Sequence, residues 1–144
     1  MIALDTNLLV YGHRIESPHH QAAKACIASL AKERAPWAIP WPCLHEFYGV
    51  VTHHRVYKTP TPAVIALNQI EAWLSATSVV LLHESAQHWQ VLRALIESAA
   101  VAGPMVHDAR IAALCLQHGV RELWSADRDF KRFSSLAVRN PLVA

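Results

Sequence analysis

Short apolar runs alternate along the whole chain with longer segments of helical periodicity, and this alternation constrains the fold more than any other feature. Parallel strands buried on both faces have this apolar character, and each requires a crossover, usually a helix, to the next strand. The expected strands are residues 2–4, 37–39, 79–82 and 121–125, with a weak last strand near Val138. We therefore expect one α/β domain over residues 1–144, with three α/β/α layers and a central, mostly parallel sheet.

Polar residues and prolines indicate where the helices begin and end. Ser17-Pro18 and Thr61-Pro62 each place an N-cap residue before a proline at the first helical position. Ser85 is expected to cap the helix that ends before Gly103-Pro104. In the first unit, Thr6 or Asn7 is expected to cap the helix that follows the opening strand.

The composition allows one sizeable core and leaves apolar surface for a partner. Of 144 residues, 53% are hydrophobic and 17% are charged, which favours oligomerisation. The apolar stretches are too short to span a bilayer and no export signal is recognised, so the expected compartment is the cytoplasm. Cys26, Cys43 and Cys115 lack the spacing of a zinc or C-x-x-C site and are expected to be reduced.

Carboxylates follow the ends of the expected strands or occur early in the next helix. They are Asp5, Glu46, Asp108 and Asp127, with Asp129 close by. Because the carboxyl ends of parallel strands share one edge of a sheet, these acids should meet there. Each acid alone is also explained by the preference of carboxylates for helix N-termini. Several together repel one another unless a cation neutralises them, and a set of oxygen ligands suits Mg²⁺ or Mn²⁺ better than zinc.

The acidic motifs occur in a specific order. D-T-N ends the first strand, a lone Glu lies on an early helix, and H-D-A-R-I-A-A and S-A-D-R-D-F follow towards the C-terminus. In this order and spacing the chain closely resembles the PIN-domain family, and more narrowly the VapC-type toxin ribonucleases of bacterial toxin–antitoxin pairs. The resemblance extends over essentially the whole chain, including the terminal R-N-P-L-V segment.

The resemblance implies a site, a cofactor and partners. The implied catalytic and metal-binding acids are Asp5, Glu46, Asp108 and Asp127. Asp129 is a further, more peripheral candidate ligand, and Asn7 and Ser125 match small polar positions that support the acids. Family members use Mg²⁺ or Mn²⁺ to cut single-stranded or looped RNA. A homodimer and a small VapB-like antitoxin, whose tail occupies the groove, are also implied.

The expected chemistry is hydrolysis by water. A cation held by the carboxylates would lower the pKa of the attacking water, and one carboxylate would accept its proton. Such a reaction leaves 5′-phosphate and 3′-hydroxyl ends instead of a cyclic phosphate. His45 and His107 are next to two of the acids, but adjacent helical residues face different ways, which disfavours a general-acid role.

Basic residues around the acidic centre are the candidates for contacts with RNA. The net charge of +2 is too small to indicate nucleic-acid binding by itself. The candidates are Arg14, Arg55, Lys58, Arg110 and Arg128. Trp41 or Tyr57 could stack on bases, although core packing explains Trp41 at least as well, and solvation explains the arginines equally.

Three alternative functions remain open from the sequence. A PIN-domain nuclease in RNA maturation or decay would use the same site without being a toxin. A phosphatase with Asp5 as nucleophile would usually carry a second acid two residues later, where this chain has Asn7. A non-catalytic binding module would keep the fold for oligomerisation without binding a metal.

Overall fold

A single parallel sheet forms the centre of the molecule. The computed structural model describes residues 1–143. The sheet has five strands in the order β3-β2-β1-β4-β5, and every neighbouring pair is parallel. The strands are β1 (Ile2–Leu4), β2 (Trp37–Pro40), β3 (Val79–Leu82), β4 (Glu122–Trp124) and β5 (Val138–Arg139). The sequence therefore predicted all five strands, and the sheet is parallel throughout.

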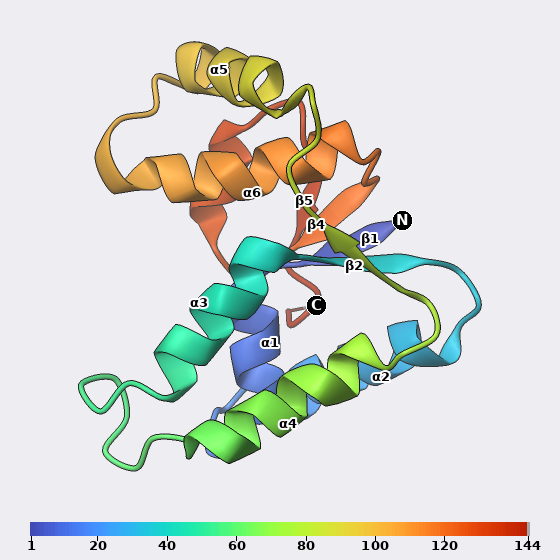
Figure 1. The fold of residues 1–144 in the computed structure, drawn as a ribbon, viewed down its shortest axis with the longest axis vertical. Helices are drawn as coiled ribbons and strands as arrows, with labels where there is room; N and C mark the ends of the chain where they lie inside the picture. Colours follow the sequence, from blue (N-terminus) through green and yellow to red (C-terminus); the bar gives the residue numbers. More distant parts are fainter. Residues whose placement is uncertain (144) are drawn as a thin grey trace.

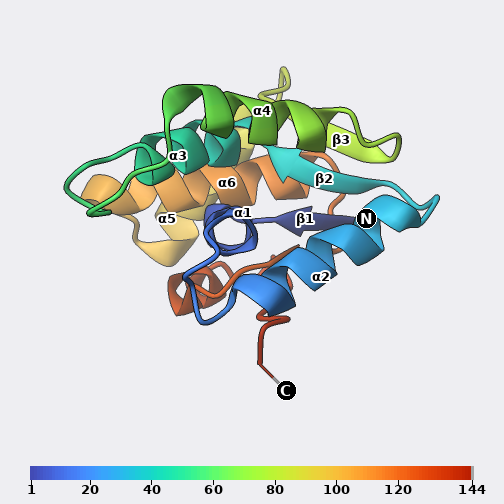
Figure 2. The same ribbon diagram turned by 90° about the horizontal axis from the view of Figure 1, so that it is seen from below.

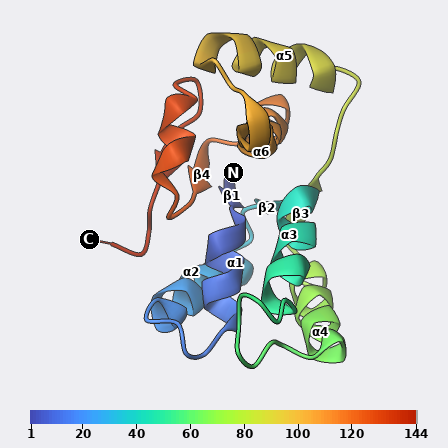
Figure 3. The same ribbon diagram turned by 90° about the vertical axis from the view of Figure 1, so that its left-hand side faces the viewer.

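Helices cover both faces of the sheet. They are α1 (Thr6–His13), α2 (His20–Lys32), α3 (Trp41–Val51), α4 (Ala63–Leu74), α5 (His88–Ala99) and α6 (Val106–Gln117), with the short 3₁₀ helices η1 (Gly103–Met105) and η2 (Arg128–Arg132). The first four lie on one side of the sheet, and α5 and α6 lie on the other (Figures 1 and 3). Figure 2 looks from the first side and shows β1 and β2 between α4 and α2. The three-layer α/β/α prediction is confirmed.

The strand register brings three chain segments to one edge of the sheet. Ile2 of β1 pairs with Trp37 of β2 on one side and with Glu122 of β4 on the other. All three strands run the same way, so the residues that follow Leu4, Pro40 and Trp124 come together. This is the edge at which parallel α/β sheets bind ligands.

Several helices do not begin at the N-cap residues that the sequence predicts. Asp5, not Thr6 or Asn7, is the N-cap of α1, and its side chain makes no capping hydrogen bond. The turn at Ser17-Pro18 precedes α2, and Ser17 Oγ accepts from the backbone N–H of His19 at 3.1 Å. Ser17 therefore closes a turn before α2 begins instead of capping the helix.

Two further boundaries differ because side chains are used elsewhere. Thr61 does not cap α4, whose N-cap is Pro62, because its hydroxyl oxygen accepts from Arg14 at 3.1 Å. Likewise Ser85 does not cap α5, which starts only at His88, because its hydroxyl oxygen accepts from the backbone N–H of Gln87 at 3.3 Å. The helix ends at Ala99, before Gly103-Pro104, as expected.

The core sits between the sheet and both helical layers. Its largest fully buried side chains include Trp37, Phe47, Phe130 and Phe133. Cys43 and Cys115 are buried and unpaired, as expected. Within residues 1–143, no helix combines the length and apolar character needed to cross a membrane.

Candidate metal centre

Four of the predicted acids line one cavity at the carboxyl edge of the sheet. This acidic cavity, of about 290 Å³, is lined by the carboxyl-bearing residues Asp5, Glu46, Asp108 and Asp127. Asp5 follows β1, Glu46 lies on α3 after β2, Asp108 is in the first turn of α6, and Asp127 follows β4. The fold therefore brings together acids that are separated by up to 122 residues in the chain.

Asp5 is the most deeply buried of these acids, with 5% of its surface exposed. Its Oδ2 accepts hydrogen bonds from Ser125 Oγ at 2.7 Å and from Asn7 Nδ2 at 3.0 Å. The Cys43 thiol lies 3.7 Å from the other oxygen, Oδ1. Burial raises the pKa of Asp5 from 3.8 to about 6, although the bond from Ser125 acts in the opposite direction. The ionised form that a cation requires is thus costly in the metal-free protein.

Asn7 and Ser125 join the end of β1 to the loop after β4. Ser125 Oγ accepts from Asn7 Nδ2 at 3.2 Å and from the backbone N–H of Asp127 at 3.0 Å. Asn7 Oδ1 accepts from the backbone N–H of Ala126 at 3.1 Å. These two side chains therefore fix Asp5 and Asp127 relative to each other, and Asn7 does not cap α1.

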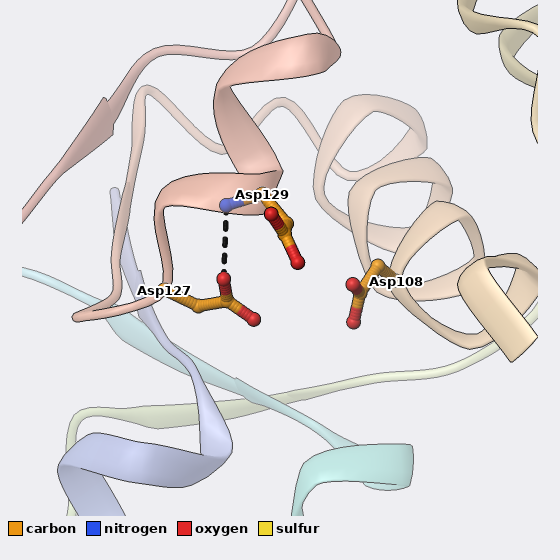
Figure 4. A group of neighbouring side chains, drawn as sticks. All are labelled: Asp108, Asp127 and Asp129. Carbon is orange, nitrogen blue, oxygen red and sulfur yellow. Dashed lines mark hydrogen bonds between the residues drawn. The ribbon is translucent and has the colours of Figure 1, made fainter.

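Asp108, Asp127 and Asp129 form a second, overlapping group. One carboxylate oxygen from each lies within 4.8 Å of one from each of the others. Figure 4 shows the three carboxylates converging, Asp108 from α6 and the other two from the start of η2. Asp127 Oδ1 also accepts from the backbone N–H of Asp129 at 2.9 Å, which closes the turn. The pKa of Asp108 is raised by burial first, and then by repulsion from Asp127 and the other acids.

The donor set fits a divalent cation. It consists of carboxylate oxygens, which Mg²⁺ and Mn²⁺ prefer, and the one nearby thiol is buried with its pKa raised well above 9. No lysine or arginine within residues 1–143 forms an ion pair with any of these five acids. Burial, and after it repulsion between the acids, raises the pKa of Asp5 and Asp108, and His107 opposes this at Asp108.

The predicted RNA-contacting cations fall into different surroundings. Arg14 is held by Glu16, by Thr59 O at 3.0 Å and by the ring of Tyr57, whose centroid is 3.9 Å from Cζ. Arg110 donates two hydrogen bonds to Glu84, at 3.0 and 2.7 Å. These two arginines are already paired with protein groups.

The other three cations are exposed, and they lie in different places. Lys58 lines a larger cavity of about 720 Å³ beyond the C-terminal end of α1. Arg128 lines a separate cavity next to Asp127. Arg55 is in the loop between α3 and α4 and lines none of the cavities described here.

The aromatic and histidine candidates lie at the margins of the site. Tyr57 lines the acidic cavity while supporting Arg14. Trp41 is half-buried, and its ring lies 6.1 Å from that of His45, centroid to centroid. His45 and His107 line an adjoining cavity of about 300 Å³ that shares Glu46 with the acidic cavity.

Sequence reasoning missed two features of the site. Nothing in the spacing of Cys43 indicated that its thiol would face Asp5. Lys131 and Asn140 line the same cavity as Arg128, and only the three-residue interval from Arg128 to Lys131 hinted at a shared surface.

Comparisons with known proteins identify the family of this chain. The family described as the PIN domain matches residues 2–136. The ribonuclease VapC43 of Mycobacterium tuberculosis is 34% identical over 99% of this chain and 96% of its own, and VapC48 of the same species is 30% identical over 95% and 94%. The solved structure of VapBC2 from Rickettsia felis bound to promoter DNA superposes with a TM-score of 0.68, at 23% identity, over 97% of this chain and 98% of that one. A family match over nearly the whole length, relatives at 30% identity or more and the shared fold lead to one conclusion: the chain belongs to the PIN-domain family and, within it, to the VapC-type proteins.

Proposed function

We propose that this protein is a toxin endoribonuclease that hydrolyses RNA phosphodiester bonds with Mg²⁺ or Mn²⁺ held in the acidic cavity. The observation that carries the proposal is the convergence of Asp5, Glu46, Asp108 and Asp127 on one cavity, with no ion pair from them to a lysine or arginine within residues 1–143. The names of the VapC ribonuclease relatives support the same reaction class.

The acids of the cavity have different proposed roles in binding the cation and in the reaction. Asp5, Asp108 and Asp127 would hold the cation, with Glu46 completing the set and Asp129 as a peripheral ligand. When bound, a divalent cation polarises the phosphate and lowers the pKa of the attacking water. Glu46 is exposed at the cavity wall, so it is the carboxylate best placed to accept a proton from water.

Ser125 and Asn7 act through Asp5. Ser125 and Asn7 both donate to Asp5 Oδ2, and the Cys43 thiol lies 3.7 Å from Oδ1, so these three side chains orient the carboxylate that would hold the cation. Water then attacks phosphorus, the bond from phosphorus to the 3′-oxygen breaks, and that oxygen takes a proton. The products carry a 5′-phosphate and a 3′-hydroxyl.

The hydrogen bonds of Asn7 also argue against the phosphatase alternative. A phosphatase would need an acid at this position, but the Asn7 amide is engaged with Asp5, Ser125 and the backbone of Ala126. Asp5 is itself 5% exposed and accepts two hydrogen bonds, which makes it a poor nucleophile.

A test of the reaction uses purified protein and single-stranded or looped RNA with Mg²⁺ or Mn²⁺. We expect wild type to cleave and Asp5→Asn and Asp108→Asn to lose cleavage, whereas the matched control Glu97→Gln, on an exposed pair in α5, should retain it. Mapping the ends should find 5′-phosphates. Undiminished cleavage by both variants, or by wild type in EDTA, would refute the proposal.

The toxin role adds two partners. We propose a homodimer and a small antitoxin whose tail occupies the groove, both in line with the exposed apolar side chains Ile15, Val56 and Leu67. Expression should arrest growth, and the product of a small adjacent gene should relieve the arrest. Cleavage in vitro without growth arrest would instead favour the nuclease of RNA maturation or decay.

A further inference from the structure

A second cavity adjoins the acidic one and has the opposite charge. This basic cavity, of about 340 Å³, is lined by the polar side chains of Arg128, Lys131 and Asn140, and it shares Asp127 with the acidic cavity. Its size is near the lower limit of sites that hold small ligands. Two groups of one ligand can therefore occupy the two cavities as neighbours, one on each side of Asp127.

The cations of the basic cavity are not neutralised. Within residues 1–143, neither Arg128 nor Lys131 forms an ion pair with a carboxylate, whereas Arg14 pairs with Glu16 and Arg110 with Glu84. Arg128 and Lys131 are both exposed, so they can bind an anion beside the acidic cavity.

Asn140 adds an uncharged hydrogen-bond donor to the lining of the basic cavity. Its Oδ1 accepts from the backbone N–H of Leu142 at 3.0 Å, which leaves the amide Nδ2 as the half of the side chain that can serve a ligand. Two cations and one amide donor suit a phosphate, because each of its oxygens accepts hydrogen bonds and the group carries a negative charge.

A single strand of RNA carries one such charge for every nucleotide, so a phosphate in the acidic cavity necessarily has another close by along the strand. We propose that the basic cavity is a phosphate subsite of the RNA strand, in which Arg128, Lys131 and Asn140 hold the phosphate next to the one being cleaved. This rests on the proposed function. The large cavity near Lys58 does not compete for this role, because Ile15, Val56 and Ile65 make much of it apolar.

The test measures RNA binding in the absence of cleavage. All proteins carry Asp5→Asn, which prevents cleavage, and a fluorescently labelled single-stranded RNA of mixed sequence is titrated at several salt concentrations. We expect Arg128→Gln and Lys131→Gln each to weaken binding on the order of fivefold and to reduce the slope of log affinity against log salt by about 0.7, and Lys131→Arg to restore it.

Arg132→Gln is the matched control. Arg132 is also exposed on η2 and carries the same charge, but it does not line the basic cavity. An equal loss of affinity in Arg132→Gln and Lys131→Gln would overturn the proposal, since it would reflect net charge alone. Unchanged RNA binding in the Arg128 and Lys131 variants, with weaker binding of polyglutamate, would assign the cavity to an acidic protein segment and overturn it too. Failure of the proposed function is recognised independently, as absent cleavage by wild type with Mg²⁺ or Mn²⁺.

Discussion

Replacing Asp5 by Asn should stabilise the metal-free protein while abolishing its activity. Burial raises the pKa of Asp5 from 3.8 to about 6, so the folded state resists ionisation of this group. Each pKa unit corresponds to about 1.4 kcal/mol, and ionised Asp5 therefore lowers the free energy of unfolding by about 3 kcal/mol at neutral pH. Asn removes the charge and keeps the shape. Its Oδ1 can accept from Ser125 and Asn7, and its Nδ2 can take the place beside Cys43.

The sign of the pH dependence follows from the direction of the pKa change. A carboxyl group with a raised pKa in the folded state favours folding when protonated, so its contribution is fully present below pH 3.8 and is lost as the pH rises through about 6. The advantage of Asp5→Asn over wild type should thus be about 2–3 kcal/mol at pH 8 and should fall to about 1 kcal/mol near pH 4.5.

The assay is urea unfolding in EDTA, followed by tryptophan fluorescence, at both pH values. Asp129→Asn serves as the control, because its side chain is exposed and its removal should change the free energy of unfolding by less than about 0.5 kcal/mol. Adding Mn²⁺ should stabilise wild type and leave Asp5→Asn nearly unchanged, since only the form that binds the ligand gains stability. A variant that is less stable than wild type at pH 8, or one with the same gain at both pH values, would refute the electrostatic reasoning.

Three further variants test the structure around the site. Ser125→Ala removes the donor to Asp5 Oδ2 and the acceptor for the backbone N–H of Asp127, so urea unfolding should show a loss of about 1–3 kcal/mol; no loss would mean that these bonds add nothing to stability. Phe47→Ala empties a site between His13 and Trp73 and should cost about 3–5 kcal/mol in the same assay, and a cost below 1 kcal/mol would contradict the packing described. Arg14→Gln releases Thr59 and Thr61, so limited proteolysis should cut faster within residues 52–62, and an unchanged cleavage rate would show that Arg14 does not hold this loop.

The local pattern determined the strands more securely than the helix ends. Apolar runs such as Val79–Leu82 indicate strands because burial in a parallel sheet requires them to be apolar, and that requirement is visible in the residues themselves. Helix starts depend on what else a capping side chain can reach. The sequence indicates Thr61 as a helix cap, but its hydroxyl group instead forms hydrogen bonds with His13 and Arg14 at the C-terminal end of α1.

The sequence by itself determined the α/β fold and identified which acids lie at strand ends or early in helices, since both follow from periodicity and from the rule that carboxyl ends of parallel strands share an edge. Only the tertiary structure decided how those acids differ. It buried Asp5 under hydrogen bonds from Ser125 and Asn7, left Glu46 exposed, and placed Asp129 with Asp108 and Asp127. It also separated paired Arg14 and Arg110 from unpaired Arg128 and Lys131. The physical reason is that pKa values and ion pairs depend on distance and burial between segments over a hundred residues apart, which no local pattern encodes.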